Sequence, residues 1–158
     1  MVDAEPPVYA DPVDFERDKR EFDEFPLHRT LALTLEELRP GFARICLATS
    51  PLTLTGIGGS VHGGLLATMV DIAMLEALFK VTRPGDRPAG TADLNITYLR
   101  PAHGKRIYAE ATVIKKGRSL AMTEVSILDE DGTLCAKGRT LYALRQADEG
   151  GNGRDRRP

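Results

Sequence analysis

Apolar and polar residues divide this chain into one long apolar helix and a series of strand-like segments. The stretch from Gly63 to Lys80 is apolar on nearly every side, has the length of a helix, and is followed by a stop signal at 83–85. Shorter segments alternate in the manner of strands and are separated by turn residues. These strands are expected at 31–38, 42–49, 91–99, 106–116, 120–128 and 133–144.

A helix that is apolar all round must be surrounded by other elements, because its surface cannot face water. The sequence supplies only one such helix, so the sheet has to cover it. The order of elements is a strand pair, one helix and then a meander of strands, which predicts an α+β domain. We expect an antiparallel sheet of five to six strands wrapped around one central helix.

The two ends of the chain differ from this body. Asp11 and Pro12 have the character of an N-cap and a first helical residue, and they predict a charged surface helix that continues to about Phe25. The last residues are rich in Gly and Arg and cannot bury apolar surface. Three parts are expected: an extension over 1–29, the folded domain over 30–145 and a disordered tail over 146–158.

The composition narrows the function classes. The 158 residues are 42% hydrophobic and 28% charged, as in ordinary soluble globular proteins. A net charge of −2 argues against a general nucleic-acid binder, which carries a basic excess. No uncharged apolar run reaches about 18 residues, and the acidic start lacks the order of a signal peptide. We expect a cytoplasmic protein without a membrane or nucleic-acid partner.

Cysteine and histidine give no sign of a metal centre. Cys46 and Cys135 lie far apart in apolar segments, which indicates buried, reduced thiols. The histidines lack metal-ligand spacing; they are His28, His62 and His103. We expect no metal and no cofactor.

Two carboxylates, Asp71 and Glu76, interrupt the apolar helix. Aspartate is a poor helix former and is rarely buried without a partner, so its presence here suggests a function. The alternative is that Asp71 faces solvent or a neighbouring subunit. Glu76 is nearer the helix end, where a simple exposed position explains it.

The helix begins at His62-Gly63-Gly64. Glycines at a helix start leave N–H groups uncovered, and the helix dipole adds partial positive charge, so this end can polarise a carbonyl or hold an oxyanion. A tight turn that needs glycine explains the same residues equally well, and His62 then caps or braces that turn. Gly63 and Asp71 are eight residues, or about 12 Å, apart along the helix. If both act on one carbonyl, they must come from different subunits.

The strand after the helix offers a third candidate. Alternation places Thr91, Asp93, Asn95 and Thr97 on one face. Thr91 is then able to orient a water molecule beside the carboxylate. On these residues alone, an ordinary solvent-facing polar face is the favoured explanation.

The ordered set of motifs resembles one known family. His62-Gly63-Gly64, followed by Asp71 nine positions after the histidine, is similar to the hotdog thioesterases of the 4-hydroxybenzoyl-CoA and phenylacetic-acid-degradation type. The similarity continues through 93–102, 116–120 and 131–136 and covers roughly residues 30–145. It implies the hotdog fold, a homodimer joined at its sheet edges, and the pairing of dimers into a homotetramer.

The resemblance also implies roles for single residues. Asp71 would be the general base or the nucleophile, and the N–H of the partner subunit's Gly63 would polarise the thioester carbonyl. Thr91 would position water, and His62 would support the site. The candidate substrate-binding positions are Gly64, Gly56, Arg100, Lys116, Gly117 and Arg118.

The substrate-binding assignments need two qualifications, one for Gly56 and one for the basic residues. Gly56 stands where relatives often have an asparagine, so substrate choice or rate is expected to differ. Arg100, Lys116 and Arg118 have the charge to grip the phosphates of coenzyme A, but solvated surface charges explain them as well.

We therefore expect hydrolysis of acyl-CoA thioesters to a free acid and coenzyme A, which enters as part of the substrate. Asp71 would activate water or attack the thioester directly. A non-catalytic acyl-CoA binder or sensor is the main alternative, and Gly56 is the residue that suggests it. A hotdog hydratase ranks lower, because it would need a paired histidine and carboxylate that the sequence does not show.

Overall fold

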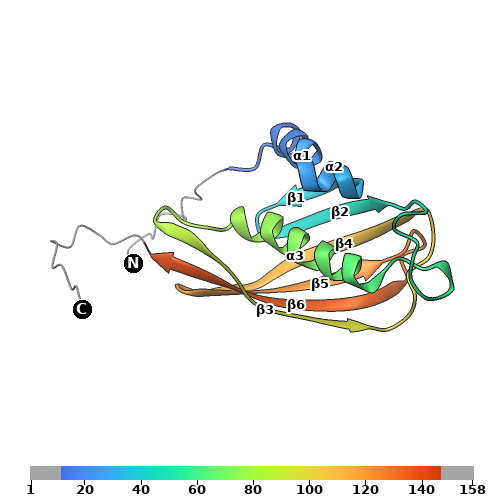
Figure 1. The fold of residues 1–158 in the computed structure, drawn as a ribbon. Coiled ribbons are helices and arrows are strands. Elements are labelled where there is room, and N and C mark those ends of the chain that lie inside the picture. The colour runs from blue at the N-terminus through green and yellow to red at the C-terminus, as the bar shows by residue number, and fades with distance from the viewer. Residues whose placement is uncertain (1–11, 147–158) are drawn as a thin grey trace, which may run out of the picture.

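A computed structural model describes residues 12–146, which form a six-stranded antiparallel sheet curled around one long helix (Figure 1). The helices are α1 (Phe15–Glu24), α2 (Pro26–Leu31) and α3 (Gly63–Phe79), with the 3-10 turn η1 (Ile57–Gly59) before α3. The strands are β1 (Leu33–Arg39), β2 (Phe42–Ala48), β3 (Asp86–Tyr98), β4 (Arg106–Lys116), β5 (Leu120–Leu128) and β6 (Leu134–Gln146).

The sheet order is β1-β2-β4-β5-β6-β3, and every neighbouring pair is antiparallel. α3 lies on the inner face and contacts all six strands. The predicted α+β hotdog fold is confirmed. The two edges of the sheet differ: α1 and α2 pack against β1, whereas β3 packs mainly against β6 and α3.

α3 buries one side and leaves the other open. The buried side chains pack on the sheet; they are Leu66, Met69, Val70, Ile72, Ala73, Met74, Ala77 and Leu78. Gly64, Thr68, Asp71 and Leu75 are spaced three or four residues apart, so they share one face of the helix, and each keeps contact with solvent. We call these four residues the open stripe. Residues 12–146 of one chain therefore do not cover α3 all round, contrary to what the sequence led us to expect.

The N-terminal helix starts later than predicted. Asp14, not Asp11, is its N-cap and accepts a hydrogen bond from the N–H of Arg17 at 3.2 Å. Pro12 precedes the helix, and Asp11 lies outside the described residues. A second short helix, α2, then begins at Pro26, because proline suits the first position of a helix. The sequence pattern did not predict this helix.

The C-terminal boundary also differs slightly from the prediction. Residue 146, assigned to the disordered tail, is the last residue of β6. The rest of the predicted tail lies outside the described residues. None of the helices within 12–146 is both long and apolar enough to cross a bilayer.

β3 is longer than predicted and irregular. It starts at Asp86, and its register with β6 slips by one residue between Thr91 and Asp93. Such a bulge reverses the alternation of side chains. Thr91 consequently reaches α3 on the same side as Leu94 and Ile96, which pack against the core. The prediction that Thr91 shares a face with Asp93 is wrong for this reason.

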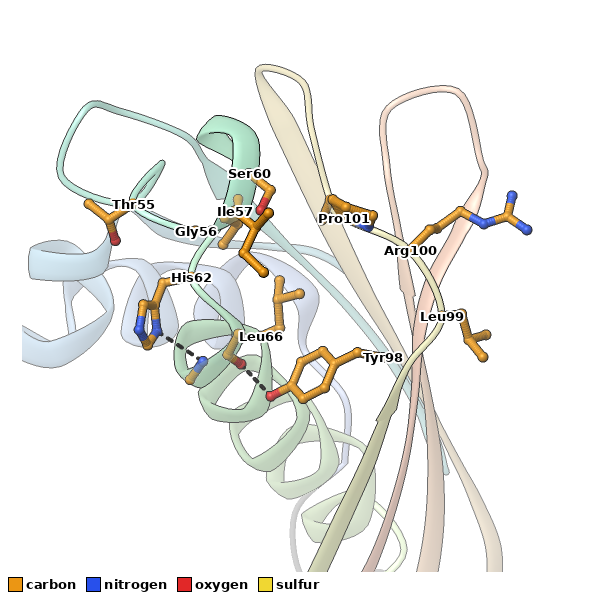
Figure 2. A pocket seen from close by; sticks show the side chains of 14 residues that line it. Thr55, Gly56, Ile57, Ser60, His62, Leu66, Tyr98, Leu99, Arg100 and Pro101 are labelled. Carbon is orange, nitrogen blue, oxygen red and sulfur yellow. Dashed lines mark hydrogen bonds between the residues drawn. The ribbon is translucent and has the colours of Figure 1, made fainter.

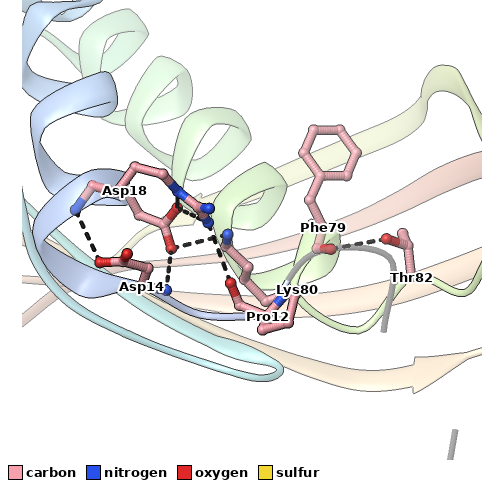
Figure 3. Close-up of polar contacts among 7 residues, drawn as sticks. Pro12, Asp14, Asp18, Phe79, Lys80 and Thr82 are labelled. Atoms are coloured by element: carbon pink, nitrogen blue, oxygen red, sulfur yellow. Dashed lines mark hydrogen bonds and ion pairs between the residues drawn. The ribbon is translucent and has the colours of Figure 1, made fainter. Parts of the chain in front are cut away.

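A buried ion pair fastens α1 to the end of α3 (Figure 3). Lys80 Nζ lies 2.9 Å from Asp18 Oδ2, and the two side chains are 8% and 5% exposed. Asp18 also accepts hydrogen bonds from Arg17 and from the N–H of Asp14, each at 3.1 Å. Burial acts to raise the pKa of Asp18, but the bonds from Lys80 and Arg17 outweigh it and hold that pKa below its usual value.

Candidate active site

Asp71 stands in the middle of α3, on the open stripe, and contacts the edge strand. The hydroxyl of Thr91 donates a hydrogen bond of 2.8 Å to Asp71 Oδ1. No residue from 12 to 146 donates to Oδ2, and the side chain is half-buried. The carboxylate is thus oriented by one oxygen and has the other available to a water molecule or a substrate.

The start of α3 presents an uncovered N–H group. His62 is the N-cap, and its Nδ1 accepts a hydrogen bond from the N–H of Gly64 at 3.0 Å. The N–H of Gly63 bonds to no residue of the described chain. The hydroxyl of Tyr98 donates to the carbonyl oxygen of Gly63 at 2.7 Å and ties the helix start to the end of β3.

Glycine at position 63 also leaves space for the Tyr98 ring. A Cβ atom there would lie 3.2 Å from the Tyr98 ring, which is closer than an ordinary van der Waals contact. The glycine therefore lets the ring and the helix start approach each other while its N–H stays open.

A cavity of about 680 Å³ opens at this helix start (Figure 2). Its lining includes His62, Gly63, Gly64 and Gly56 among the predicted site residues. Arg100 also borders it, but its guanidinium group points away from α3 in Figure 2. Asp71 and Thr91 are not part of the lining. One chain therefore holds the two halves of the predicted site apart, about 12 Å along the helix.

Gly56 closes a tight loop before the helix. Its N–H donates to the carbonyl oxygen of Ser60 at 2.8 Å. A Cβ atom at this position would lie 2.6 Å from Ser60 Oγ and 2.9 Å from two carbonyl oxygens. An asparagine side chain does not fit this loop as it stands, which explains the departure from the pattern of relatives noted in the sequence.

Lys116, Gly117 and Arg118 lie at the opposite end of the sheet from this cavity (Figure 1). Lys116 forms an ion pair with Asp86, and its side chain is only 10% exposed. The backbone oxygen of Arg118 accepts a hydrogen bond from Gln146 at 2.8 Å. Within one chain these residues brace the strand ends and do not join Arg100 at a common phosphate site.

Glu76 was not singled out as a site residue, and the expectation of an exposed position is wrong. It is half-buried and lines a second cavity, of about 380 Å³, between α3 and the two N-terminal helices. Burial raises the pKa of its carboxyl group to about 7, against a partial lowering by the charge of Lys80. A carboxylate placed in an otherwise apolar helix was the available sequence signal. Its burial depends on α1, which sequence patterns do not place.

Comparisons with known proteins identify the family to which this chain belongs. The model of the family described as "Thioesterase superfamily" matches residues 58–136. Human acyl-coenzyme A thioesterase 13 is 38% identical over 109 residues, which cover 68% of this chain and 76% of that protein. The medium/long-chain acyl-CoA thioesterase YigI of Salmonella typhimurium is 28% identical over 132 residues, covering 75% of this chain and 85% of YigI.

Solved structures give the same result. The crystal structure of zebra fish thioesterase superfamily member 2 superposes with a TM-score of 0.73 at 30% sequence identity. The match covers 84% of this chain and 99% of the zebra fish chain. A thioesterase family protein from Silicibacter pomeroyi matches with the same TM-score at 25% identity, over 85% of this chain and 100% of its own. This chain therefore belongs to the thioesterase superfamily and is an enzyme that hydrolyses thioesters.

Proposed function

We propose that this enzyme hydrolyses acyl-CoA thioesters to a free acid and coenzyme A. The observation that supports this most is the state of Asp71, with one carboxylate oxygen held by Thr91 and the other unbonded within the described chain. Relatives named as acyl-CoA thioesterases support the choice of substrate.

In the proposed reaction Asp71 accepts a proton from a water molecule, whose hydroxide adds to the thioester carbon. The carbonyl oxygen gains negative charge and is stabilised by an uncovered N–H at a helix start, a contribution of about 3 kcal/mol. The C–S bond then breaks, and the thiolate of coenzyme A takes up a proton. Direct attack by Asp71 on the thioester carbon is the alternative route to the same products. Neither route calls for a metal or another cofactor.

The helix N–H in this scheme comes from the Gly63 of a second copy. Gly63 and Asp71 of one chain are about 12 Å apart along α3, which is too far for one carbonyl group to contact both. Two features favour a second copy as the source: the open stripe that carries Asp71, and the edge strand β3 with backbone groups available for pairing. We therefore propose a homodimer as the smallest active unit, with a dimer of dimers as the expected larger assembly.

The test is the substitution Asp71→Asn, which keeps the size of the side chain. We expect thiol release from acyl-CoA to fall by about 10³-fold, as measured with a thiol reagent. Melting temperature and mass in solution should match the unsubstituted protein. Full turnover in this variant would remove Asp71 from the mechanism.

The loop at Gly56 gives a reason to vary the substrate in this test. It has no room for the polar side chain that relatives often carry there. A panel of acyl-CoA molecules scored for both binding and thiol release identifies which of them are turned over. Tight binding without thiol release from any member of the panel would contradict the proposed acyl-CoA hydrolysis.

A further inference from the structure

The cavity under α1 has aromatic walls and meets the open stripe at Leu75, one helical turn beyond Asp71. Phe22 and Phe25 approach it from the N-terminal helices, and Ile72, Leu75 and Phe79 approach it from α3. At about 380 Å³, it is within the range of ligand pockets, roughly 300–1,000 Å³. Residue 75 belongs to the open stripe, so the cavity borders the face that carries Asp71.

Among the polar side chains that line the cavity, Glu21 is exposed to solvent, and the buried ones have partners in the described part of the chain, except Glu76. Asp18 and Lys80 form their ion pair at 2.9 Å. Nδ1 of His28 forms a hydrogen bond of 2.9 Å with the carbonyl oxygen of Phe22. Burial lowers the pKa of its ring, so the imidazole is neutral near pH 7. The carboxyl group of Glu76 has no hydrogen bond or ion pair to any residue from 12 to 146.

We infer that this cavity receives the far end of the acyl group, and that Glu76 selects acyl chains ending in a hydroxyl group. The inference rests on the proposed function. Glu76 lies five residues beyond Asp71, which is about 7.5 Å along the helix and about 140° around it. A medium-length acyl chain bound at Asp71 would cross the surface of α3 over Leu75 and Ile72 to place its last carbon beside the Glu76 carboxyl group.

The chemistry of the cavity favours a hydroxyl end over other ends. A methyl end leaves a half-buried carboxyl group without a donor, which is costly. A carboxylate end would meet Glu76 together with Asp18 and Glu21, which all line the cavity. An ammonium end would be attracted by Glu76 but would also lie beside the Lys80 cation, which offsets part of that attraction. A hydroxyl group donates to Glu76 and needs no counter-charge.

The N-terminal wall of this cavity lies outside the part of the chain that the family model matches. α1 and α2 lie before residue 58, where the match to the family model begins. The buried Asp18–Lys80 pair holds α1 in place over the cavity. Selection at the far end of the acyl group therefore depends on the N-terminal extension, for which the sequence alone indicated no role.

The test compares octanoyl-CoA with 8-hydroxyoctanoyl-CoA, which differ only at the far end. We expect the native enzyme to favour the hydroxylated substrate by roughly tenfold in kcat/KM. Glu76→Leu should reverse this preference, and Glu76→Gln should reduce it to below about threefold. Glu24→Gln is the matched control, because Glu24 is exposed on α1 and outside the cavity; its ratio should equal that of the native enzyme.

The dependence of this ratio on pH gives a second readout that a purely structural role would not produce. The native preference should grow as pH rises through about 7, where Glu76 ionises and becomes the stronger acceptor. In Glu76→Gln the ratio should stay constant with pH. Effects on Asp71 cancel, because both substrates react at the same centre.

The possible outcomes separate this inference from the proposed function. Absence of thiol release from every acyl-CoA would contradict the function itself. Turnover of both substrates with equal kcat/KM in the native enzyme, or with a ratio that Glu76→Leu leaves unchanged, would overturn the inference alone.

Discussion

Asp71 and Glu76 stand five residues apart on the same helix, yet their surroundings are opposite. Asp71 lies on the open stripe, where Thr91 holds one carboxylate oxygen at 2.8 Å. Glu76 lies in an aromatic cavity, has no hydrogen-bond partner within residues 12–146, and has a pKa raised to about 7 by burial. Position on a helix therefore says little about the chemistry of a carboxyl group. The elements packed beside it determine that chemistry.

The two sides of α3 are also completed differently. The Glu76 side is covered by α1 of the same chain and fixed by the Asp18–Lys80 pair. The Asp71 side has no such cover from residues 12–146. The Glu76 side of α3 is thus covered when one chain folds, and we propose that a second copy covers the Asp71 side.

The largest expected effect tests how firmly the closed side is held. Asp18→Ala removes a buried carboxylate that accepts from Lys80, from Arg17 and from a backbone N–H. Loss of one partner of a buried pair typically costs about 3–5 kcal/mol, so we expect the free energy of unfolding to fall by about that amount. Urea denaturation at pH 7 measures it.

An exposed pair provides the control for this prediction. Glu37 and Arg39 lie 3.1 Å apart with side chains at least half exposed, at 50% and 60%. Glu37→Ala should change the free energy of unfolding by less than about 1 kcal/mol. Equal effects of the two substitutions would show that α1 is not anchored by Asp18.

The next effect sharpens the account of the open side. Gly63→Pro removes the uncovered N–H at the first helical position, where proline is otherwise well tolerated. Gly63→Ala adds the same crowding against Tyr98 but keeps the N–H. We expect kcat of the proline variant to be about 10²-fold below that of the alanine variant. Similar rates in both variants would argue against this N–H as the oxyanion donor.

Mixing variants tests whether the two halves of the site come from different chains. Asp71→Asn and Gly63→Pro subunits, unfolded and refolded together, should recover about a quarter of native activity. Half of the randomly formed dimers contain both variants, and each of these has one intact site out of two. No recovery above the separate variants would place both residues in the same subunit's site.

The fold was predictable from the sequence because its signals are long and local. The apolar stretch after His62 corresponds to α3, and the alternating segments correspond to β4, β5 and β6 within about two residues. The N-terminal region was less predictable. Whether Asp11 or Asp14 caps a helix depends on small differences between neighbouring residues, and α2 is only six residues long.

The positions of candidate residues were predictable where they follow from one helix, since Gly63 begins α3 and Asp71 lies within it as expected. It was not predictable where contacts between distant elements decide the role. Lys116 has the charge of a phosphate ligand, but its ammonium group forms an ion pair with Asp86. Glu76 looks exposed in the sequence, and only the packing of α1 makes it buried.

A smaller effect, on stability, tests the environment of Glu76. Its pKa is about 7 in the folded protein against 4.5 ordinarily, so the neutral form is favoured by folding. The contribution of Glu76 to the free energy of unfolding is therefore fully present below about pH 4.5 and is lost as pH rises through 7. Solvent access to this half-buried group limits the loss to about 1–2 kcal/mol.

Glu76→Gln should be more stable than the native protein by this amount at pH 8 and equal to it at pH 4, as measured by urea denaturation. A constant difference between the two pH values would contradict the burial of this carboxyl group.

The smallest effect concerns Thr91, which reaches Asp71 only because of the bulge in β3. Its hydroxyl is the single donor to the Asp71 carboxylate within residues 12–146, so it positions that group and does not itself react. Thr91→Val keeps the shape of the side chain and removes the donor, and we expect kcat to fall about tenfold with KM little changed. Thr91→Ser restores the donor and should restore kcat. A side chain that served only to fill space would give the reverse order, with valine close to native and serine impaired, because serine lacks the methyl group that valine retains. The order of these two variants therefore decides whether the edge strand helps to orient the open carboxylate or merely passes beside it.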